Sequence, residues 1–191
     1  MEKQRLQELA GIAKDNWENP NTTLDDHPQL KNKIQQDNAK ERGQYSQDRY
    51  SNPGRNKIVY DFGGSEWSVS GKNVTVIDIE PNDFGDDSNF TEDEEGNKQK
   101  YIQHDLLKPI KLPPADFIQC TDMIINAVSS DNDIKAITNN IDTNLKSGGI
   151  LRIHDTLENL ETIAVSILNS YKIIEYDYED GSDMILLVFK K

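Results

Sequence analysis

Cysteine is almost absent from this chain of 191 residues, in which Cys120 stands alone. A single cysteine excludes an intrachain disulfide framework, and its place in an apolar run predicts a small buried side chain. No apolar run approaches the roughly 20 residues that cross a bilayer, so we expect no membrane span. The first residues lack the continuous apolar stretch of a signal peptide, so we expect a cytoplasmic protein.

Basic residues are also scarce, with 21 Lys and Arg against 34 Asp and Glu, for a formal net charge of -13. So little cationic surface displaces few counterions from a phosphate backbone, and nucleic acid is therefore not expected as a partner. Cysteine and histidine do not cluster at zinc spacing, and the acidic segment 83–95 lacks the fixed spacing of a calcium loop. We therefore expect no metal site, and we expect segment 83–95 to be a solvated loop.

The N-terminal quarter of the chain is the most polar part, which agrees with a mean hydropathy of -0.77 for the whole. It carries weak helical patterns over residues 2–14 and 28–42 and a turn signal at Asn52-Pro53-Gly54. We predict that residues 1–52 form an arm and residues 53–191 form one domain. Three interpretations of the arm are open: a disordered tail, a lid over a substrate, or a docking element for a protein partner.

Strands and helices alternate after residue 53. Ile and Leu at helical spacing predict helices over 131–145 and 157–168, and Gly148-Gly149 is expected to cap the first of them. Strands are expected at 57–62, 74–79, 101–103, 115–120, 150–153, 171–176 and 184–189. This alternation predicts an α/β fold with a mostly parallel sheet. The short turn before the last strand predicts a C-terminal antiparallel pair at one edge.

Acids and glycines follow the first three predicted strands of the domain. The run from Val59 to Gly64 resembles the first motif of the class I S-adenosylmethionine-dependent methyltransferases, an acid before a glycine-rich turn. The segments around Asp78 and Asp105 resemble the second and third motifs. Leu145-Lys146-Ser147-Gly148-Gly149 resembles the family's turn into its fifth strand. The resemblance runs from residue 57 to the end of the chain.

This resemblance implies a Rossmann-like class I methyltransferase fold with S-adenosylmethionine as cofactor. It implies that Asp61, Gly63 and Gly64 approach the cofactor, that Asp78 accepts from the ribose hydroxyls, and that Asp105 accepts from the adenine amino group. The first motif departs from the family's three glycines, because Ser65-Glu66-Trp67 follows the glycine pair. Trp67 is expected either to pack on the sulfonium of the cofactor or to fill space left by a shortened helix.

One histidine lies at the edge where ligands of such a sheet bind. His154 follows the fifth predicted strand, and an imidazole can accept a proton at neutral pH, so His154 is a candidate catalytic base. The alternative is that Asp155 or Thr156 beside it only caps the next helix. The sequence thus predicts a methyltransferase for a small molecule or a protein side chain. A second hypothesis is a catalytically silent module that docks a partner through residues 1–52.

Overall fold

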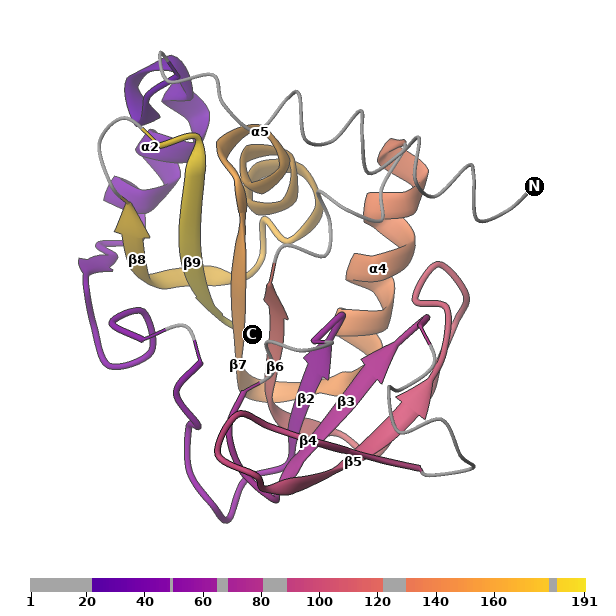
Figure 1. Cartoon of the computed structure of the whole chain (residues 1–191). Coiled ribbons are helices and arrows are strands. Elements are labelled where there is room, and N and C mark those ends of the chain that lie inside the picture. The colour runs from indigo at the N-terminus through magenta and orange to yellow at the C-terminus, as the bar shows by residue number, and fades with distance from the viewer. Residues whose placement is uncertain (1–21, 49, 65–68, 81–88, 122–129, 179–181) are drawn as a thin grey trace.

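A single sheet of nine strands organises the parts that the computed structural model describes, which are residues 22–48, 50–64, 69–80, 89–121, 130–178 and 182–191 (Figure 1). The strands are β1 (Lys40–Glu41), β2 (Val59–Phe62), β3 (Val74–Asp78), β4 (Phe90–Glu92), β5 (Lys98–Gln103), β6 (Ala115–Thr121), β7 (Leu145–Thr156), β8 (Lys172–Tyr178) and β9 (Met184–Lys190). Their order across the sheet is β1-β8-β9-β7-β6-β2-β3-β5-β4.

The strand directions match the predicted α/β fold. The pairs of β2 with β3, β2 with β6, β3 with β5 and β6 with β7 are all parallel. β9 runs antiparallel to both β7 and β8, which confirms the antiparallel C-terminal pair. The expected edge position of this pair is wrong, because β1 of the N-terminal arm pairs in parallel outside β8. β9 is enclosed between β8 and β7.

The two predicted helices of the domain are both present, and each begins at a side-chain cap. Helix α4 (Asp131–Asn144) follows Ser130, whose side chain accepts a hydrogen bond from the Asp133 amide. Helix α5 (Leu157–Glu161) follows Thr156, which accepts from the Asn159 amide, and it continues as the π-helix η2 (Thr162–Ile167). The predicted cap at Gly148-Gly149 is wrong: α4 ends at Asn144, and Gly148, with φ of 75°, lies within β7.

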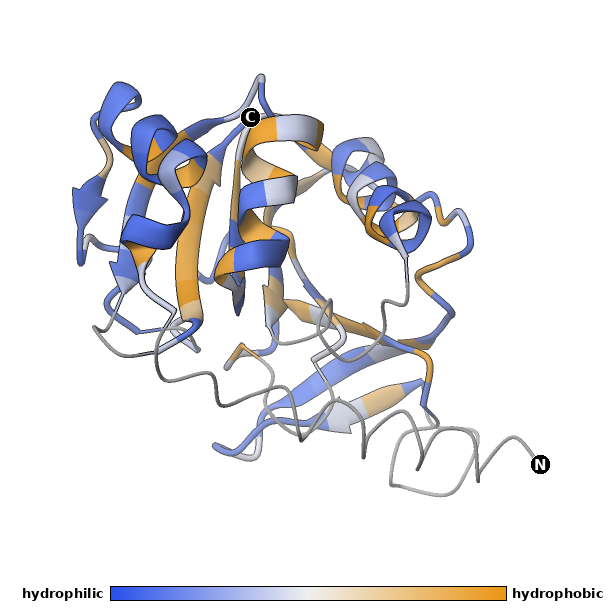
Figure 2. Cartoon of the chain, turned by 90° about the horizontal axis from the view of Figure 1, so that it is seen from above, coloured by the Kyte–Doolittle hydropathy of each residue, from blue (hydrophilic) through white to orange (hydrophobic). Residues whose placement is uncertain are grey.

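The described helices lie in one layer against one face of the sheet (Figure 2). The larger hydrophobic core fills the space between this layer and the sheet, and it includes Phe62, Ile137 and Leu160. The opposite face, called here the second face, carries a smaller core around Val76, Phe117 and Val188. Among the described residues, no helix contributes to this smaller core. In the described part of the chain, Tyr45 of the N-terminal segment packs against this smaller core.

The N-terminal arm wraps around the β8 edge of the sheet. Its 3-10 turn η1 (Leu24–Asp26) leads into helix α2 (Pro28–Gln36), which packs beside α5 and η2 and buries Leu30 and Ile34. The predicted helix over 28–42 thus ends at residue 36, and β1 follows it. Residues 42–48 and 50–52, called here the strap, then cross onto the second face. The division of the chain at residue 52 into an arm and a domain stays a prediction.

The acidic segment is more ordered than a solvated loop in the part that the structure describes. Residues 90–92 form strand β4, and the Asp93 side chain is only 7% exposed. Its carboxylate accepts hydrogen bonds from the amides of Gly71, Glu95 and Asn97. Asp93 therefore fixes the turn between β4 and β5, and the prediction of a solvated loop is wrong here. Residues 83–88 lie outside the described residues.

Two asparagines of α4 hold the connection between β5 and β6. The Asn140 side chain accepts from the Ile110 amide at 3.0 Å and donates to the carbonyls of Leu106 and Lys108 at 2.8 and 2.9 Å. Asn144 repeats the arrangement one turn later. Side chains thus satisfy the polar backbone of a connection that has no helix of its own. None of the helices in the described ranges is long and apolar enough to cross a membrane.

Candidate functional site

Five predicted site residues lie along one edge of the sheet, at the carboxyl ends of neighbouring parallel strands. Asp61 lies in β2, and Gly63 and Gly64 follow it directly. Asp78 ends β3, and Asp105 lies just beyond the end of β5. Because β2, β3 and β5 are adjacent, the structure brings these residues to a common edge. Ligands of open α/β sheets bind at this edge.

Asp61 is a fully buried carboxyl group that is only partly satisfied. Its Oδ2 accepts from the Val69 amide at 2.6 Å, whereas Oδ1 has no hydrogen-bond partner among the described residues. Burial raises the pKa of Asp61 from 3.8 to about 7. Gly64 lies against this group, and a Cβ at residue 64 would come within 2.4 Å of the Asp61 Cγ. The glycine is therefore required by close packing, and Oδ1 is a buried acceptor that is left unsatisfied among the described residues.

The other two acids differ in how far their carboxylates are already engaged. Asp78 is 8% exposed, and its Oδ1 accepts from the Glu80 amide at 3.0 Å. Burial raises the pKa of Asp78 as well. Asp105 closes its own turn, where Oδ1 accepts from the Leu107 amide at 3.0 Å and Oδ2 lies 3.2 Å from the Lys108 Nζ. Of the two, Asp78 is thus better placed to receive a hydroxyl group.

Part of this edge lies outside the described residues. Glu66 and Trp67 belong to the segment 65–68, and so the two expectations for Trp67 are not addressed by the described structure. The segments 81–88 and 122–129, which follow β3 and β6, are outside it too. The described part of this edge therefore consists of the carboxyl ends of the strands and the first residues that follow β2, β3 and β5.

His154 lies on the second face of β7, beside a small cavity. It is in register with Thr121 of β6 on one side and with Leu186 of β9 on the other. The cavity has a volume of about 260 Å³. It is lined by Arg42, Ser46, Gln47, His154, Asp177, Ser182, Met184 and Leu186. Arg42 donates from Nε to Asp177 Oδ1 at 2.8 Å, so one wall of the cavity is an ion pair between the strap and β8.

This cavity lies close to the predicted cofactor residues. Phe62 of β2 is in register with Cys120 of β6, and Cys120 is in register with Ile153 of β7. His154 is therefore two strands away from Gly63, which corresponds to roughly 10 Å. Cys120 itself is 1% exposed, as the sequence predicts.

A row of polar side chains crosses the second face between β2, which carries Asp61, and β7, which carries His154. Asp61, Gln119 and Arg152 occupy paired positions on β2, β6 and β7. Arg152 is 1% exposed and donates from Nε to Gln119 Oε1 at 2.6 Å. The Gln119 Nε2, like the Asp61 Oδ1, has no partner in the described part of the chain. Two complementary buried groups thus lie on neighbouring strands next to the carboxyl edge.

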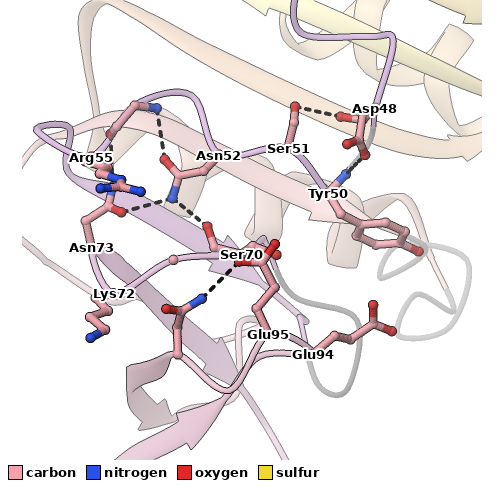
Figure 3. A pocket seen from close by; sticks show the side chains of 13 residues that line it. Asp48, Tyr50, Ser51, Asn52, Arg55, Ser70, Lys72, Asn73, Glu94 and Glu95 are labelled. Carbon is pink, nitrogen blue, oxygen red and sulfur yellow. Dashed lines mark hydrogen bonds between the residues drawn. The ribbon is translucent and has the colours of Figure 1, made fainter.

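A larger cavity, of about 950 Å³, opens at the opposite edge of the sheet (Figure 3). It is lined by residues from three loops that precede β2, β3 and β5. Asn52 joins two of these loops, since its Nδ2 donates to the Ser70 carbonyl and to Asn73 Oδ1. The amino ends of parallel strands face away from the ligand edge, so this cavity is not part of the same site.

Comparison with known proteins gives a clear structural answer. No family model and no curated protein matches the sequence. A TehB-like S-adenosylmethionine-dependent methyltransferase from Corynebacterium glutamicum is similar in structure, with a TM-score of 0.56 and 16% identity over 72% of this chain and 82% of that one. A methyltransferase from Methanosarcina mazei has a TM-score of 0.54 and 11% identity over 75% and 95%. This chain has the class I methyltransferase fold.

A third similar structure is the N-methyltransferase NodS from Bradyrhizobium japonicum, determined in complex with S-adenosylhomocysteine. Its TM-score is 0.53, with 14% identity over 87% of this chain and 86% of NodS. At these identities the similarity establishes the fold and nothing finer. The predicted class I methyltransferase fold is therefore confirmed, whereas the roles of individual residues rest on their own geometry.

Sequence reasoning missed the polar groups on the second face of this methyltransferase fold. Gln119 and Arg152 interrupt apolar strands, and Glu175 lies in β8 with its side chain only 8% exposed. The available signal was a polar residue next to apolar residues inside each strand, which predicts a buried partner. The Nδ1 of His27, the residue before α2, lies 3.1 Å from Glu161 Oε2. No group of three or more metal-ligating side chains occurs among the residues that the structure describes.

Proposed function

We propose that this chain is an S-adenosylmethionine-dependent methyltransferase that acts on a small polar molecule. The observation that carries the proposal is the buried, unpartnered Asp61 Oδ1 under the Gly63-Gly64 turn, at the carboxyl end of β2. It stands in a fold shared with methyltransferases, one of which, NodS, has been determined with the product of the cofactor. A buried acceptor at this place calls for a donor from a ligand.

The residues of this edge fit the cofactor. The Asp61 Oδ1 would accept from its α-ammonium group, and the glycine pair lets the backbone approach without a Cβ. Asp78 would accept from the ribose hydroxyls, and Asp105 would lie near the adenine, where it would have to give up a bond within its turn. When bound, S-adenosylmethionine supplies an electrophilic methyl group on a sulfonium.

The contribution of the chain itself is to position the acceptor. We assign the acceptor to the cavity beside His154, because this cavity lies on the same edge, two strands from β2. A volume of about 260 Å³ suits a small molecule, and the lining of charged and amide groups suits a polar one. His154 would take the proton of an acceptor that has one to lose, and fixed geometry would provide most of the rate.

The alternative function is a silent module that docks a partner through residues 1–52. The described part of that arm is packed against its own sheet, with α2 on the helix layer and the strap on the second face. This packing favours a role within the fold over one as an extended docking element. The departure from the family's glycines at Ser65 is the feature on which the alternative rests.

Calorimetric titration with S-adenosylhomocysteine and S-adenosylmethionine tests the proposal. We expect micromolar binding to the wild-type chain. Asp78→Asn should weaken it by about ten- to a hundredfold, the value of one or two hydrogen bonds to a charged group. Asp116→Asn is the matched control, since Asp116 lies at the amino end of β6 and pairs with Lys146 there. Absence of binding to the wild type at millimolar ligand would refute the cofactor assignment.

A further inference from the structure

A buried arginine, Arg152, helps to hold the strap on the second face. Besides its bond to Gln119, the Arg152 guanidinium donates from Nη1 to the carbonyls of Tyr45 and Asp48 at 3.0 and 2.8 Å. It also donates to the hydroxyl and the carbonyl of Ser51 at 3.2 and 3.1 Å. A buried cation is costly unless its donors are satisfied, and here four of the bonds go to the strap.

Phe117 of β6 contacts both Arg152 and Tyr45 of the strap. The guanidinium carbon lies 5.0 Å from the centre of the Phe117 ring, and the Tyr45 ring lies 6.1 Å from the same ring. A second anchor is Glu175 of β8, whose carboxylate accepts from the amides of residues 44, 45 and 46 at 2.7 to 3.0 Å. The strap therefore has two buried charged anchors of opposite sign, on neighbouring parts of the sheet.

The same strap forms one wall of the cavity beside His154. Arg42, Ser46 and Gln47 line that cavity from the strap side. His154 lies two residues beyond Arg152 on β7, so both side chains point to the second face. The anchor and the candidate base thus lie next to each other under the same segment. Loss of the Arg152 anchor would loosen this wall, which Glu175 and the Arg42–Asp177 pair also hold, while the strand that carries His154 stays in place.

We propose that Arg152 is a positioning residue for the acceptor pocket, because it holds the strap as the wall that closes the His154 cavity and limits the pocket to small molecules. The role of the pocket in binding an acceptor rests on the proposed function, whereas the closure by the strap does not. Arginine suits this task because its planar fork reaches acceptors on two sides at once. Lysine at this position could satisfy fewer of the same carbonyls, and methionine none.

Two ligand-free measurements on the full chain test the proposal. Hydrogen exchange of the strap amides reports whether the strap is held, and the rate of diethylpyrocarbonate modification of His154 reports whether the cavity is closed. In Arg152→Met we expect strap exchange about tenfold faster, the loss of one to two net hydrogen bonds, and His154 modification several times faster. Arg152→Lys should lie between this variant and the wild type. Modification of His104 should not change in either variant.

Glu161→Gln is the matched control. Glu161 anchors the other part of the arm, since it accepts from the amides of Gln29 and Leu30 on the helix side of the sheet. This variant should expose His27 and leave the strap and His154 unchanged. Wild-type strap exchange and His154 reactivity in both Arg152 variants would overturn the proposal. Equal acceleration at His27, His104 and His154 would overturn it too, because that pattern indicates a general structural role.

These outcomes are separate from the test of the cofactor. If the wild type binds no S-adenosylhomocysteine but the strap responds as expected, the closure by Arg152 stands and the cofactor assignment fails. If S-adenosylhomocysteine binds and the strap does not respond, the closure fails alone. If Arg152→Met does not fold, Arg152→Lys still decides the question, since it keeps the charge and the stacking on Phe117.

Discussion

The buried carboxyl group of Asp61 should make the stability of this protein fall as the pH rises. Its pKa is about 7 in the folded chain and has the ordinary value of 3.8 once burial is lost. Below pH 3.8 the group is protonated in both states. Between these two values the unfolded chain releases a proton that the folded chain retains, so the free energy of unfolding decreases. Above pH 7 the decrease is complete.

The size of the effect follows from the two pKa values. Each unit of difference corresponds to 1.36 kcal/mol, so the shift from 3.8 to about 7 costs about 4 kcal/mol of stability at high pH. Between about pH 5 and about pH 8 the change is about 2–3 kcal/mol, because part of the cost is already present at the lower pH. Asp61→Asn removes the titrating group and keeps an oxygen that can accept from the Val69 amide.

Urea denaturation of the wild type and of Asp61→Asn at these two pH values measures the effect. We expect the stability difference between the two proteins to change by about 2–3 kcal/mol in favour of the variant as the pH rises. For Asp116→Asn we expect the opposite sign. The wild type should lose stability relative to this variant as the pH falls, because the hydrogen bond from Lys146 lowers the pKa of Asp116 in the fold. A constant difference between wild type and Asp61→Asn from pH 5 to 8 would show that Asp61 is already ionised in the fold.

Three further substitutions test the packing around the site. Gly64→Ala should weaken S-adenosylhomocysteine binding by at least about tenfold in calorimetry, because its Cβ would displace the Asp61 carboxyl group. Glu175→Gln should cost about 1–2 kcal/mol in urea unfolding, since a neutral amide replaces a carboxylate that accepts three backbone amides of the strap. Asn140→Ala should cost about 2–3 kcal/mol in the same assay by leaving buried backbone groups unpaired. The exposed neighbour Asn139→Ala should change stability by less than about 0.5 kcal/mol, and equal losses in both variants would contradict the role of Asn140.

The central elements of the fold could be predicted because their patterns are local. Ile134, Ile137 and Ile141 recur at helical spacing, and this periodicity places α4 within one residue of its observed end. The apolar runs that form β2 and β3 are equally plain, and each carries an acid in its last two residues. Since parallel strands deliver their carboxyl ends to one edge, the grouping of Asp61 with Asp78 follows from the sequence.

The arm and the second face could not be predicted in the same way. Residues 40–48 and 50–52 have no periodic apolar pattern from which their structure could be predicted. Hydrogen bonds to side chains that are distant in the sequence hold them instead. The predicted helix over 28–42 extended too far, because Asn38, two residues after the observed end of α2, adopts a positive φ of 53° before the chain pairs with β8 as β1. His154 was found as a strand-end histidine, but its cavity depends on the strap and is invisible without it.

The pairing of β1 with β8 has a consequence for the order in which the chain folds. The strap and its anchor on β8 are some 130 residues apart along the sequence. During synthesis the N-terminal segment leaves the ribosome first, yet its docking surface on β7 and β8 is made last. Loop closure over such a separation is slow compared with the local pairing of β7 and β9. The wall of the His154 cavity is therefore expected to be the last part of the protein to assemble, after the rest of the sheet is complete.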